Sequence, residues 1–316
     1  MTTDIRDART ARSLLAAAAM VAALSVTGCS RDMLTPPSVA RPLLEPNFDR
    51  TARGFDFTTI DVTGATTTNP QGINAGGDIV GSYVAGGVTR GFLLKNGSVE
   101  TIEVPGAGFT VAHGIGPGGE IVGNYRAPNA ASVVSFGFLR RKDGKFDELS
   151  FPGKKHVIPQ RILPDGTVLG CAHDNDLMAS MVGMRIGSKG SDAISTFASM
   201  HNGATPDERR IVGLYANMDA GNRGEGYYID DGIFTPFLIP GSTSTAAWDV
   251  NARGDIVGVF QNASGTHGFL MSAFGYTTID FAGATATRAF GINARGDIVG
   301  TYVQGGVTHG FLARRL

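Results

Sequence analysis

The chain has little charge, few cysteines and a single tryptophan. Asp, Glu, Lys and Arg make up 17% of its 316 residues, and the net charge is −1. Such low charge excludes a charged disordered protein and a Glu/Lys-rich helical bundle, and gives no electrostatic reason to expect nucleic acid as a partner. Cys29 and Cys171 are too few for a disulfide framework. Glycine, in contrast, occurs 45 times, about twice its usual share.

The first 28 residues have the pattern of an export signal. Three arginines precede an apolar run at 14–26, which is shorter than the ~20 residues that span a bilayer. Residues 26–29 (Val-Thr-Gly-Cys) resemble a bacterial lipobox, which implies cleavage before Cys29 and lipid attachment to its sulfur. Ser30 rather than Asp follows Cys29, and this favours outer-membrane sorting in a Gram-negative host. The alternative is an ordinary signal peptide with a coincidental cysteine.

Three segments follow from this pattern. Residues 1–28 are predicted to be a lipoprotein signal peptide, and residues 29–54 a proline-rich tether lipidated at Cys29. Residues 55–316 are predicted to form one folded body. We therefore expect an extracytoplasmic protein with a lipid anchor, either periplasmic or surface-exposed, whose folded body is monomeric.

The folded body repeats itself with a period of about 44 residues. The segment at 57–97 returns with few changes at 276–316. A fifth copy is recognisable at 249–270, and three degenerate copies lie between the first and the fifth. One glycine of the repeat, usually in Ile-Val-Gly, occurs at Gly81, Gly123, Gly170, Gly213, Gly258 and Gly300. A second, usually in Gly-Phe-Leu, occurs at Gly91, Gly137, Gly183, Gly226, Gly268 and Gly310. Six copies fill the body without a gap.

Each copy divides into four short runs rich in β-branched and aromatic residues. No run has the 3.6-residue spacing of a helix, and Asn96-Gly97 is a strong hairpin signal. Four antiparallel strands in 40–50 residues are typical of a propeller blade. The alternatives are a β-solenoid or a pair of β-sandwiches, although a solenoid usually has a shorter period.

The two ends of the body complement each other. The last copy stops after its third strand, whereas the body begins with an unaccompanied strand at 55–62. Pairing that strand with residues 310–312 closes the ring and removes exposed strand edges. The predicted fold is therefore all-β, a closed six-bladed β-propeller.

The repeat resembles that of a bacterial family of probable extracellular proteins named HAF. The Gly-x-Asn-x-x-Gly-x-Ile-Val-Gly element of that family is clear at 72–81, 249–258 and 291–300. The His-Ala-Phe-Leu element appears as His-Gly-Phe-Leu at 267–270 and 309–312, with Gly in place of Ala. The resemblance implies a secreted, repeat-built β protein and transfers no catalytic residue.

Two Arg-Gly-Asp tripeptides, at 253–255 and 295–297, match a cell-adhesion motif. They occupy the same place in the repeat, where a tight turn needs glycine, so we interpret them as turns. Asn and Asp around these turns could bind calcium. Two or three oxygens per turn are fewer than the six to eight that calcium takes, and these residues also favour turns by bonding their own backbone.

Several polar and aromatic residues are predicted to meet at one mouth of the central channel. They lie near first or third strands of the repeats, whose loops share one face of a propeller. A tryptophan among histidines and arginines is suited to stacking on a sugar ring or binding an anion. The candidate ligand-binding residues are Arg90, His113, His201, Trp248, Asp249, His267, Arg288 and His309. Singly, each could instead cap a strand or fill space.

Three classes of function remain open. The first, which we favour, is a non-enzymatic binding or scaffold module for a glycan or an envelope protein. The second is a lyase or hydrolase for extracellular sugars or lactones, which rests on analogy of fold alone and would need more carboxylates than Asp249. The third is a purely structural envelope lipoprotein. No catalytic residue, cofactor or metal site is predicted.

Overall fold

The structure is a computed structural model that describes residues 54–132, 134–175, 180–188, 190–195, 197–273 and 275–316. The predicted signal peptide, Cys29 and all of the predicted tether except Gly54 lie outside these ranges. Within the described ranges, no helix has the length and apolar character needed to cross a membrane.

Strands dominate the described chain and fall into six consecutive groups of four. Group 1 consists of β2 (Thr67–Ile73), β3 (Ile79–Ala85), β4 (Val88–Lys95) and β5 (Ser98–Ile102). Group 2 consists of β6 (Phe109–Ile115), β7 (Ile121–Arg126), β8 (Phe136–Arg140) and β9 (Phe146–Leu149). Group 3 consists of β10 (His156–Ile162), β11 (Val168–His173), β12 (Val182–Gly187) and β13 (Gly190–Ala193). Group 4 consists of β14 (Ser199–Ala204), β15 (Arg210–Asn217), β16 (Arg223–Asp230) and β17 (Ile233–Phe237). Group 5 consists of β18 (Ser244–Val250), β19 (Ile256–Asn262), β20 (Gly265–Ser272) and β21 (Gly275–Ile279). Group 6 consists of β22 (Ala286–Ile292), β23 (Ile298–Gln304), β24 (Val307–Arg315) and β1 (Phe55–Ile60). A short 3-10 helix, η1 (Met218–Ala220), lies between β15 and β16.

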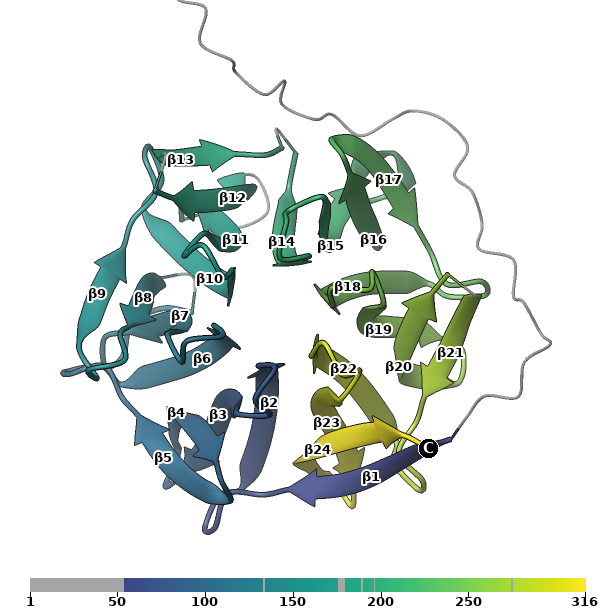
Figure 1. Cartoon of the computed structure of the whole chain (residues 1–316), viewed down its shortest axis with the longest axis horizontal. Helices are drawn as coiled ribbons and strands as arrows, with labels where there is room; N and C mark the ends of the chain where they lie inside the picture. Colours follow the sequence, from purple (N-terminus) through teal and green to yellow (C-terminus); the bar gives the residue numbers. More distant parts are fainter. Residues whose placement is uncertain (1–53, 133, 176–179, 189, 196, 274) are drawn as a thin grey trace, which may run out of the picture. The chain divides into compact units, whose positions relative to one another are not determined.

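The groups follow one another around a common axis (Figure 1). Within each group the strands pair antiparallel, with the first strand innermost and the fourth outermost. They follow chain order in groups 1 to 5, whereas β1 is the fourth strand of group 6. Single parallel contacts, Thr89 with Phe109 and Thr266 with Ala286, join group 1 to group 2 and group 5 to group 6. The predicted turn at Asn96-Gly97 is observed, with both residues at positive φ between β4 and β5.

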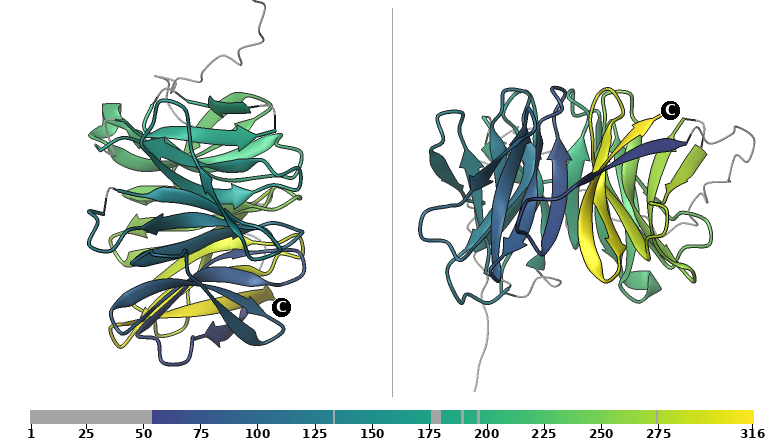
Figure 2. Two further views of the ribbon diagram at one scale, coloured as in Figure 1. Left: turned by 90° about the vertical axis from the view of Figure 1, so that its left-hand side faces the viewer. Right: turned by 90° about the horizontal axis from the view of Figure 1, so that it is seen from below.

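The predicted pairing between the two ends of the body is also found. β1 lies antiparallel to β24, with Ile60 opposite Gly310 and Thr58 opposite Leu312, and Figure 2 shows the two strands side by side near the C-terminus. The innermost strand of group 1, β2, packs against β22, β23 and β24 of group 6. The last group therefore takes three strands from the end of the body and one from its beginning.

The repeated glycines are explained by a close contact inside each group. A Cβ on Gly81 would lie 2.2 Å from the carbonyl oxygen of Asn69 and 2.8 Å from the ring of Phe92. The ring from the third strand thus occupies the space over the glycine of the second. The equivalent large side chains are at most 1% exposed in all six groups: Phe92, Phe138, Met184, Tyr227, Phe269 and Phe311.

Each innermost strand carries a bulge at the same repeat position. The register shifts by one residue there, so that one residue of the strand has no partner on the second strand. The six residues left out, which we call the bulge ring, are Gln71, His113, Gln160, Asn202, Trp248 and Phe290. A bulge bends its strand and re-aims a side chain, and these residues surround the axis.

Candidate functional site

Neighbouring innermost strands are in close contact just after the bulge ring. The next residue is glycine in four groups: Gly72, Gly114, Gly203 and Gly291. A Cβ on Gly72 would lie 2.6 Å from the carbonyl oxygen of His113, and one on Gly114 would lie 2.6 Å from that of Gln160. Groups 3 and 5 have Arg161 and Asp249 instead. We call this level of the channel the constriction.

Arg161 and Asp249 form an ion pair across the constriction. Arg161 Nε lies 3.2 Å from Asp249 Oδ1, and their side chains are 11% and 9% exposed. Asp249 also accepts hydrogen bonds from the backbone N–H groups of Ile292, at 3.0 Å, and Val250, at 2.9 Å. Both oxygens of this buried carboxylate are therefore bonded, as a buried charge requires.

The rest of the Arg161 guanidinium holds the bulge ring. Its Nη1 donates to the carbonyl oxygens of His113, at 2.8 Å, and Gln160, at 2.9 Å. Its Nη2 donates to those of Gln71, at 3.1 Å, and Phe290, at 2.7 Å. One side chain of group 3 thus bonds groups 1, 2, 3 and 6, and pairs with group 5. It positions the strands whose bulged side chains surround the channel.

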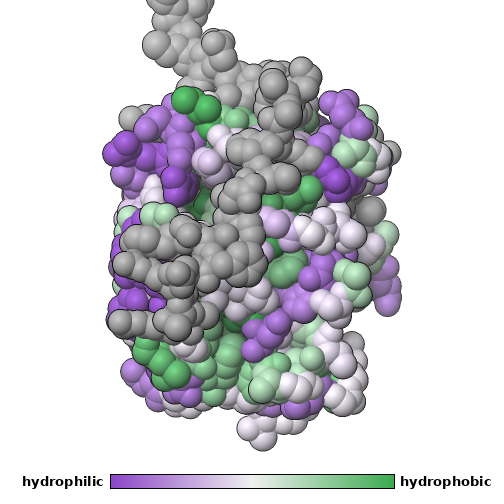
Figure 3. All heavy atoms as spheres, turned by 90° about the vertical axis from the view of Figure 1, so that its right-hand side faces the viewer, coloured by the Kyte–Doolittle hydropathy of each residue, from purple (hydrophilic) through white to green (hydrophobic). Residues whose placement is uncertain are grey.

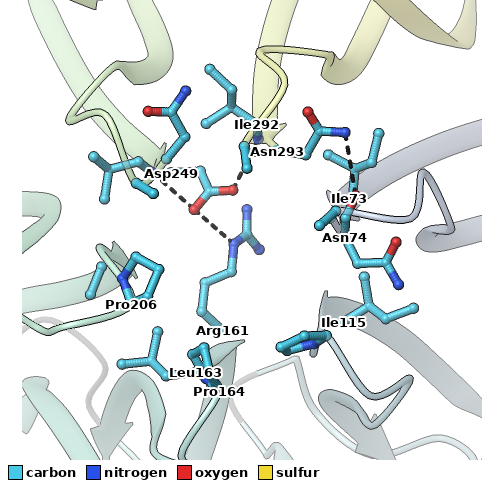
Figure 4. Close-up of a pocket in the computed structure, with 18 of the residues that line it drawn as sticks. Ile73, Asn74, Ile115, Arg161, Leu163, Pro164, Pro206, Asp249, Ile292 and Asn293 are labelled. Atoms are coloured by element: carbon cyan, nitrogen blue, oxygen red, sulfur yellow. Dashed lines mark hydrogen bonds and ion pairs between the residues drawn. The ribbon is translucent and has the colours of Figure 1, made fainter.

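Beyond the constriction, at the ends of the innermost strands, lies a pit of about 160 Å³ (Figure 4). Apolar side chains form much of its wall, and those drawn in Figure 4 include Ile73, Ile115, Leu163, Pro164, Pro206 and Ile292. The Arg161–Asp249 pair stands among them. Since that pair is bonded to the protein, the pit offers a ligand no unpaired charge.

On the other side of the constriction, two adjoining cavities open at the beginnings of the innermost strands. The tryptophan subsite, about 450 Å³, is lined by Trp248 and by small and aliphatic residues such as Ala246, Leu214 and Val259. The hydroxyl subsite, about 500 Å³, is lined by five hydroxyl side chains: Thr67, Ser82, Thr89, Thr301 and Thr308. The wall that both subsites share consists of Gln71, His113, Arg288 and Phe290.

Among the lining residues of the two subsites, Arg288 is the one Arg, Lys, Asp or Glu side chain. It lies on β22 opposite Thr301 and is half-buried. Within the described part of the chain it has no hydrogen bond and no ion pair. A half-buried guanidinium that the protein leaves unpaired is equipped to bind a carboxylate or phosphate.

His113 contributes a neutral ring to the shared wall. Its Nε2–H donates to Asn124 Oδ1 at 2.7 Å, and Asn124 in turn donates to Ser135 Oγ at 2.6 Å. Burial, reinforced by the positive charge of Arg161, lowers the pKa of His113 to about 4 against the opposing effect of the Asn124 bond. At neutral pH the ring therefore adds no charge beside Arg288.

Trp248 and Phe290 form an aromatic corner of the tryptophan subsite. Their ring centroids are 5.2 Å apart and their planes meet at 88°. Both are bulge residues of neighbouring groups, and Trp248, the single tryptophan of the chain, is half-buried. An indole that borders a cavity can stack on the apolar face of a sugar ring.

Of the eight predicted ligand-binding residues, the structure brings three together in these subsites: His113, Trp248 and Arg288. The prediction for Asp249 is wrong, because its side chain faces Arg161 at the constriction and does not lie at the mouth. It follows the bulge residue Trp248, so its side chain leaves the strand at a different level.

The prediction for His201 is also wrong, because this residue is completely buried and does not reach the mouth. Its Nδ1 is hydrogen-bonded to the hydroxyl of Tyr227, and a Cβ on Gly183 would lie 2.2 Å from its Nε2. Burial lowers its pKa to about 3. His201 precedes the bulge residue Asn202, so it points into the packing between groups 3 and 4.

The other three predicted ligand-binding residues lie on third strands, and, contrary to the prediction, they line neither subsite. Each bonds an acidic residue that directly follows a fourth strand. Arg90 forms an ion pair with Glu103 at 3.7 Å, and the Nδ1 atoms of His267 and His309 are hydrogen-bonded to Asp280 and Asp61, both at 2.9 Å. Arg90 and His309 directly follow Thr89 and Thr308, which do line the hydroxyl subsite. Because successive side chains of a strand point to opposite faces, Arg90 and His309 point away from it.

The Arg-Gly-Asp turns serve contacts between groups. Arg295 pairs with Asp297 of its own turn at 2.9 Å and donates from Nη1 to the carbonyl oxygen of Ala75, at 2.6 Å. Arg253 makes the equivalent bond to the carbonyl oxygen of Ala294. The motif therefore links group 6 to group 1 and group 5 to group 6, with its carboxylate already paired.

The asparagines of these turns bond their own backbone, as the turn interpretation predicts. Asn293 Oδ1 accepts from the N–H groups of Arg295 and Asp297, both at 3.0 Å. Across the described ranges, no group of three or more His, Cys, Asp or Glu side chains is arranged to hold a metal ion. Cys171 is a buried free thiol whose pKa burial raises to about 12.

Sequence reasoning missed Arg161, Gln71 and Phe290. A usable signal was present for Arg161, because it and Asp249 replace the glycine that four of the repeats carry at that position. Two charges of opposite sign at one crowded repeat position predict a pair across the axis. Gln71 and Phe290 gave no such signal, since the bulge position varies freely between repeats.

No protein-family model matches the chain, and no curated protein matches it. Among solved structures, it is similar to a putative TolB from Agrobacterium tumefaciens, with TM-score 0.52, 12% identity, and coverage of 78% of this chain and 89% of that one. It is also similar to the β-propeller domain of the Trilobed protease from Pyrococcus furiosus, with TM-score 0.50, 10% identity, and coverage of 79% and 94%. A virginiamycin B lyase from Staphylococcus aureus gives TM-score 0.46 and 16% identity, with coverage of 82% and 99%.

At these identities the first two likenesses describe the fold alone. The chain has an all-β fold of the β-propeller type.

Proposed function

We propose that the chain is a six-bladed β-propeller of the HAF type, closed by β1, that serves as a non-enzymatic glycan-binding module outside the cytoplasm. Six antiparallel groups and the pairing of β1 with β24 support the blade count and the closure. The contacts of β2 with group 6 support a continuous ring.

The location rests on the N-terminal sequence. The apolar run at 14–26 and the lipobox-like residues 26–29 favour export, lipid attachment at Cys29 and, with Ser30, the outer membrane. A Cys29→Ser variant of the full chain should lose both the lipid mass and membrane association. Retention of both by the variant would overturn the anchor.

The binding function rests mainly on the cavity bordered by Trp248 and Arg288. Its two subsites of about 450 and 500 Å³ are in the range of small-molecule sites. An aromatic corner on one side and five hydroxyl side chains on the other match the apolar faces and hydroxyl groups of sugars. Arg288 supplies an unpaired cation between them.

Binding is favoured over catalysis because none of the lining residues of the two subsites is a carboxylate. The histidine there, His113, has a pKa of about 4 and is bonded through Nε2, so it is poorly suited to proton transfer near neutral pH.

A glycan is also favoured over a docked protein. Figure 3 shows hydrophilic and hydrophobic residues interspersed over the coloured part of one side of the molecule. In the described ranges, the exposed large hydrophobic residues are few and are distributed over groups 1, 4 and 6: Val99, Met218, Ile233, Val307 and Leu316. A protein-docking surface usually has a contiguous apolar patch.

A thermal-shift screen of the purified chain against neutral and acidic oligosaccharides tests this function. A ligand at ~100 times its Kd adds ~2.7 kcal/mol of stability, which raises the Tm by several degrees. The shift should disappear in Trp248→Ala. A screen without any shift, or a shift that Trp248→Ala retains, would overturn glycan binding in this cavity.

A further inference from the structure

The shared wall between the two subsites decides which sugars fit. Arg288 and Gln71 belong to both subsites, so one ligand group placed at this wall can be reached from either side. The wall thus lies between an aromatic subsite and a hydroxyl-lined one. A ligand that fills both must carry a group complementary to Arg288 near its middle.

The charge of the wall selects an anion. Arg288 has no acidic partner in the described chain, and His113 beside it is neutral at pH 7. An anionic group bound here would be paired by a guanidinium inside a half-buried cavity, where charge-assisted hydrogen bonds are about twice as strong as neutral ones. The planar fork of arginine matches the two oxygens of a carboxylate.

Other polar groups of the two subsites are left unbonded by the described protein. The side-chain amide of Gln71 and the indole N–H of Trp248 have no hydrogen-bond partner among the described residues. Asn69 Oδ1, in the hydroxyl subsite, and His113 Nδ1 are buried and also lack one. Two of the six buried side-chain nitrogen and oxygen atoms that lack a hydrogen-bond partner in the described chain thus belong to residues that line this cavity. Together with the unbonded amide of Gln71 and the indole N–H of Trp248, they favour a polar ligand, since buried polar groups are normally hydrogen-bonded.

We infer that the ligand is an acidic oligosaccharide with a uronate at the shared wall. This inference rests on the proposed glycan binding and makes it specific. The uronate carboxylate pairs with Arg288, one neighbouring sugar ring stacks against Trp248, and the next places its hydroxyl groups against the threonines of the hydroxyl subsite. The cavity thereby distinguishes uronate-containing chains from neutral ones.

Isothermal titration calorimetry with matched sugars tests the inference. The ligands are disaccharides and trisaccharides of galacturonate, glucuronate and mannuronate, each compared with its methyl ester, which removes the charge and keeps the ring. For at least one pair, the wild-type chain should bind the acid tenfold or more tightly than the ester. Arg288→Gln should reduce that ratio to within about threefold, and Arg288→Lys should retain part of it.

Arg209→Gln, which alters an exposed arginine paired with Asp231, is the matched control and should keep the wild-type ratio. Equal binding of acid and ester, or a ratio unchanged in Arg288→Gln, overturns the uronate inference and leaves glycan binding standing. If neither acids, esters nor neutral oligosaccharides bind, the inference and the proposed function both fall.

Discussion

Arg161 and Arg288 occupy innermost strands on two sides of the same channel, yet their surroundings give them opposite roles. Arg161 is 9% exposed, pairs with Asp249 and donates to four carbonyl oxygens. Arg288 is half-buried and has no partner among the described residues. The comparison indicates that the constriction holds the fold together, whereas the cavity beside it retains unused binding capacity.

The largest expected effect comes from Arg161→Ala. It leaves the buried carboxylate of Asp249 and four carbonyl oxygens without their partner, so the free energy of unfolding should fall by about 3–5 kcal/mol. Urea denaturation at pH 7 measures the change. Arg209→Ala, which removes an exposed pair whose side chains are 71% and 63% exposed, should cost at most about 1 kcal/mol. Equal losses of unfolding free energy in Arg161→Ala and Arg209→Ala would contradict a special structural role of the buried pair.

A double variant sharpens the same comparison. Arg161→Ala combined with Asp249→Ala removes both charges, and should cost less than the two single losses added together. Additive losses would mean that the pair does not couple groups 3 and 5.

The loss of stability at acidic pH should come in large part from His113. Its pKa is about 4 in the folded chain, against an ordinary value of 6.5, so the unfolded chain takes up the proton first as the pH falls. Stability is therefore lost between about pH 6.5 and pH 4. From pH 7.5 to 4.5, the wild type should lose roughly 2–3 kcal/mol more than His113→Asn. The free energy of unfolding is measured by urea denaturation at each pH. His201 is present in both proteins, so its contribution cancels, and an equal pH dependence in both would contradict a buried, neutral His113.

A smaller loss is expected at the junction of groups 6 and 1. Arg295→Ala removes the hydrogen bond to the carbonyl oxygen of Ala75 and should lower stability by about 1 kcal/mol. Arg253→Ala, which removes the equivalent bond between groups 5 and 6, should cost a similar amount in chemical denaturation. An unchanged stability in both would show that the turns do not link the groups.

The smallest effect on stability is expected for Arg288→Ala. Because this side chain has no partner in the described protein, the free energy of unfolding from urea denaturation should stay within about 0.5 kcal/mol of wild type. A loss approaching that of Arg161→Ala would mean that Arg288 supports the fold.

Much of the fold was predictable from the sequence, since the same residues recur at the same packing positions. The glycine of Ile-Val-Gly lies opposite the large residue after the second glycine in every group, and their period predicted the four-stranded unit. The pairing of residues 55–62 with residues 310–312 followed from counting strands, and β1 and β24 pair in that way.

The site was predicted only in part, because a bulge shifts side chains by one position. A one-residue shift in a strand moves a side chain to the other face. Trp248 is a bulge residue and lines the cavity, whereas His201 precedes a bulge and is buried between groups. Nothing in the local composition marks which residue of the strand is bulged. His113 and Arg288 line the cavity, whereas Asp249 lies at the constriction.

The most direct test of the proposed site uses the fluorescence of Trp248, the one tryptophan of the chain. Titration with uronate oligosaccharides should change its emission saturably in the wild type, and the half-saturation concentration should rise tenfold or more in Arg288→Gln. Saturable calorimetric binding with unchanged Trp248 emission would place the ligand elsewhere and contradict the assignment of the cavity. A half-saturation concentration that Arg288→Gln leaves unchanged would contradict the role of the unpaired arginine.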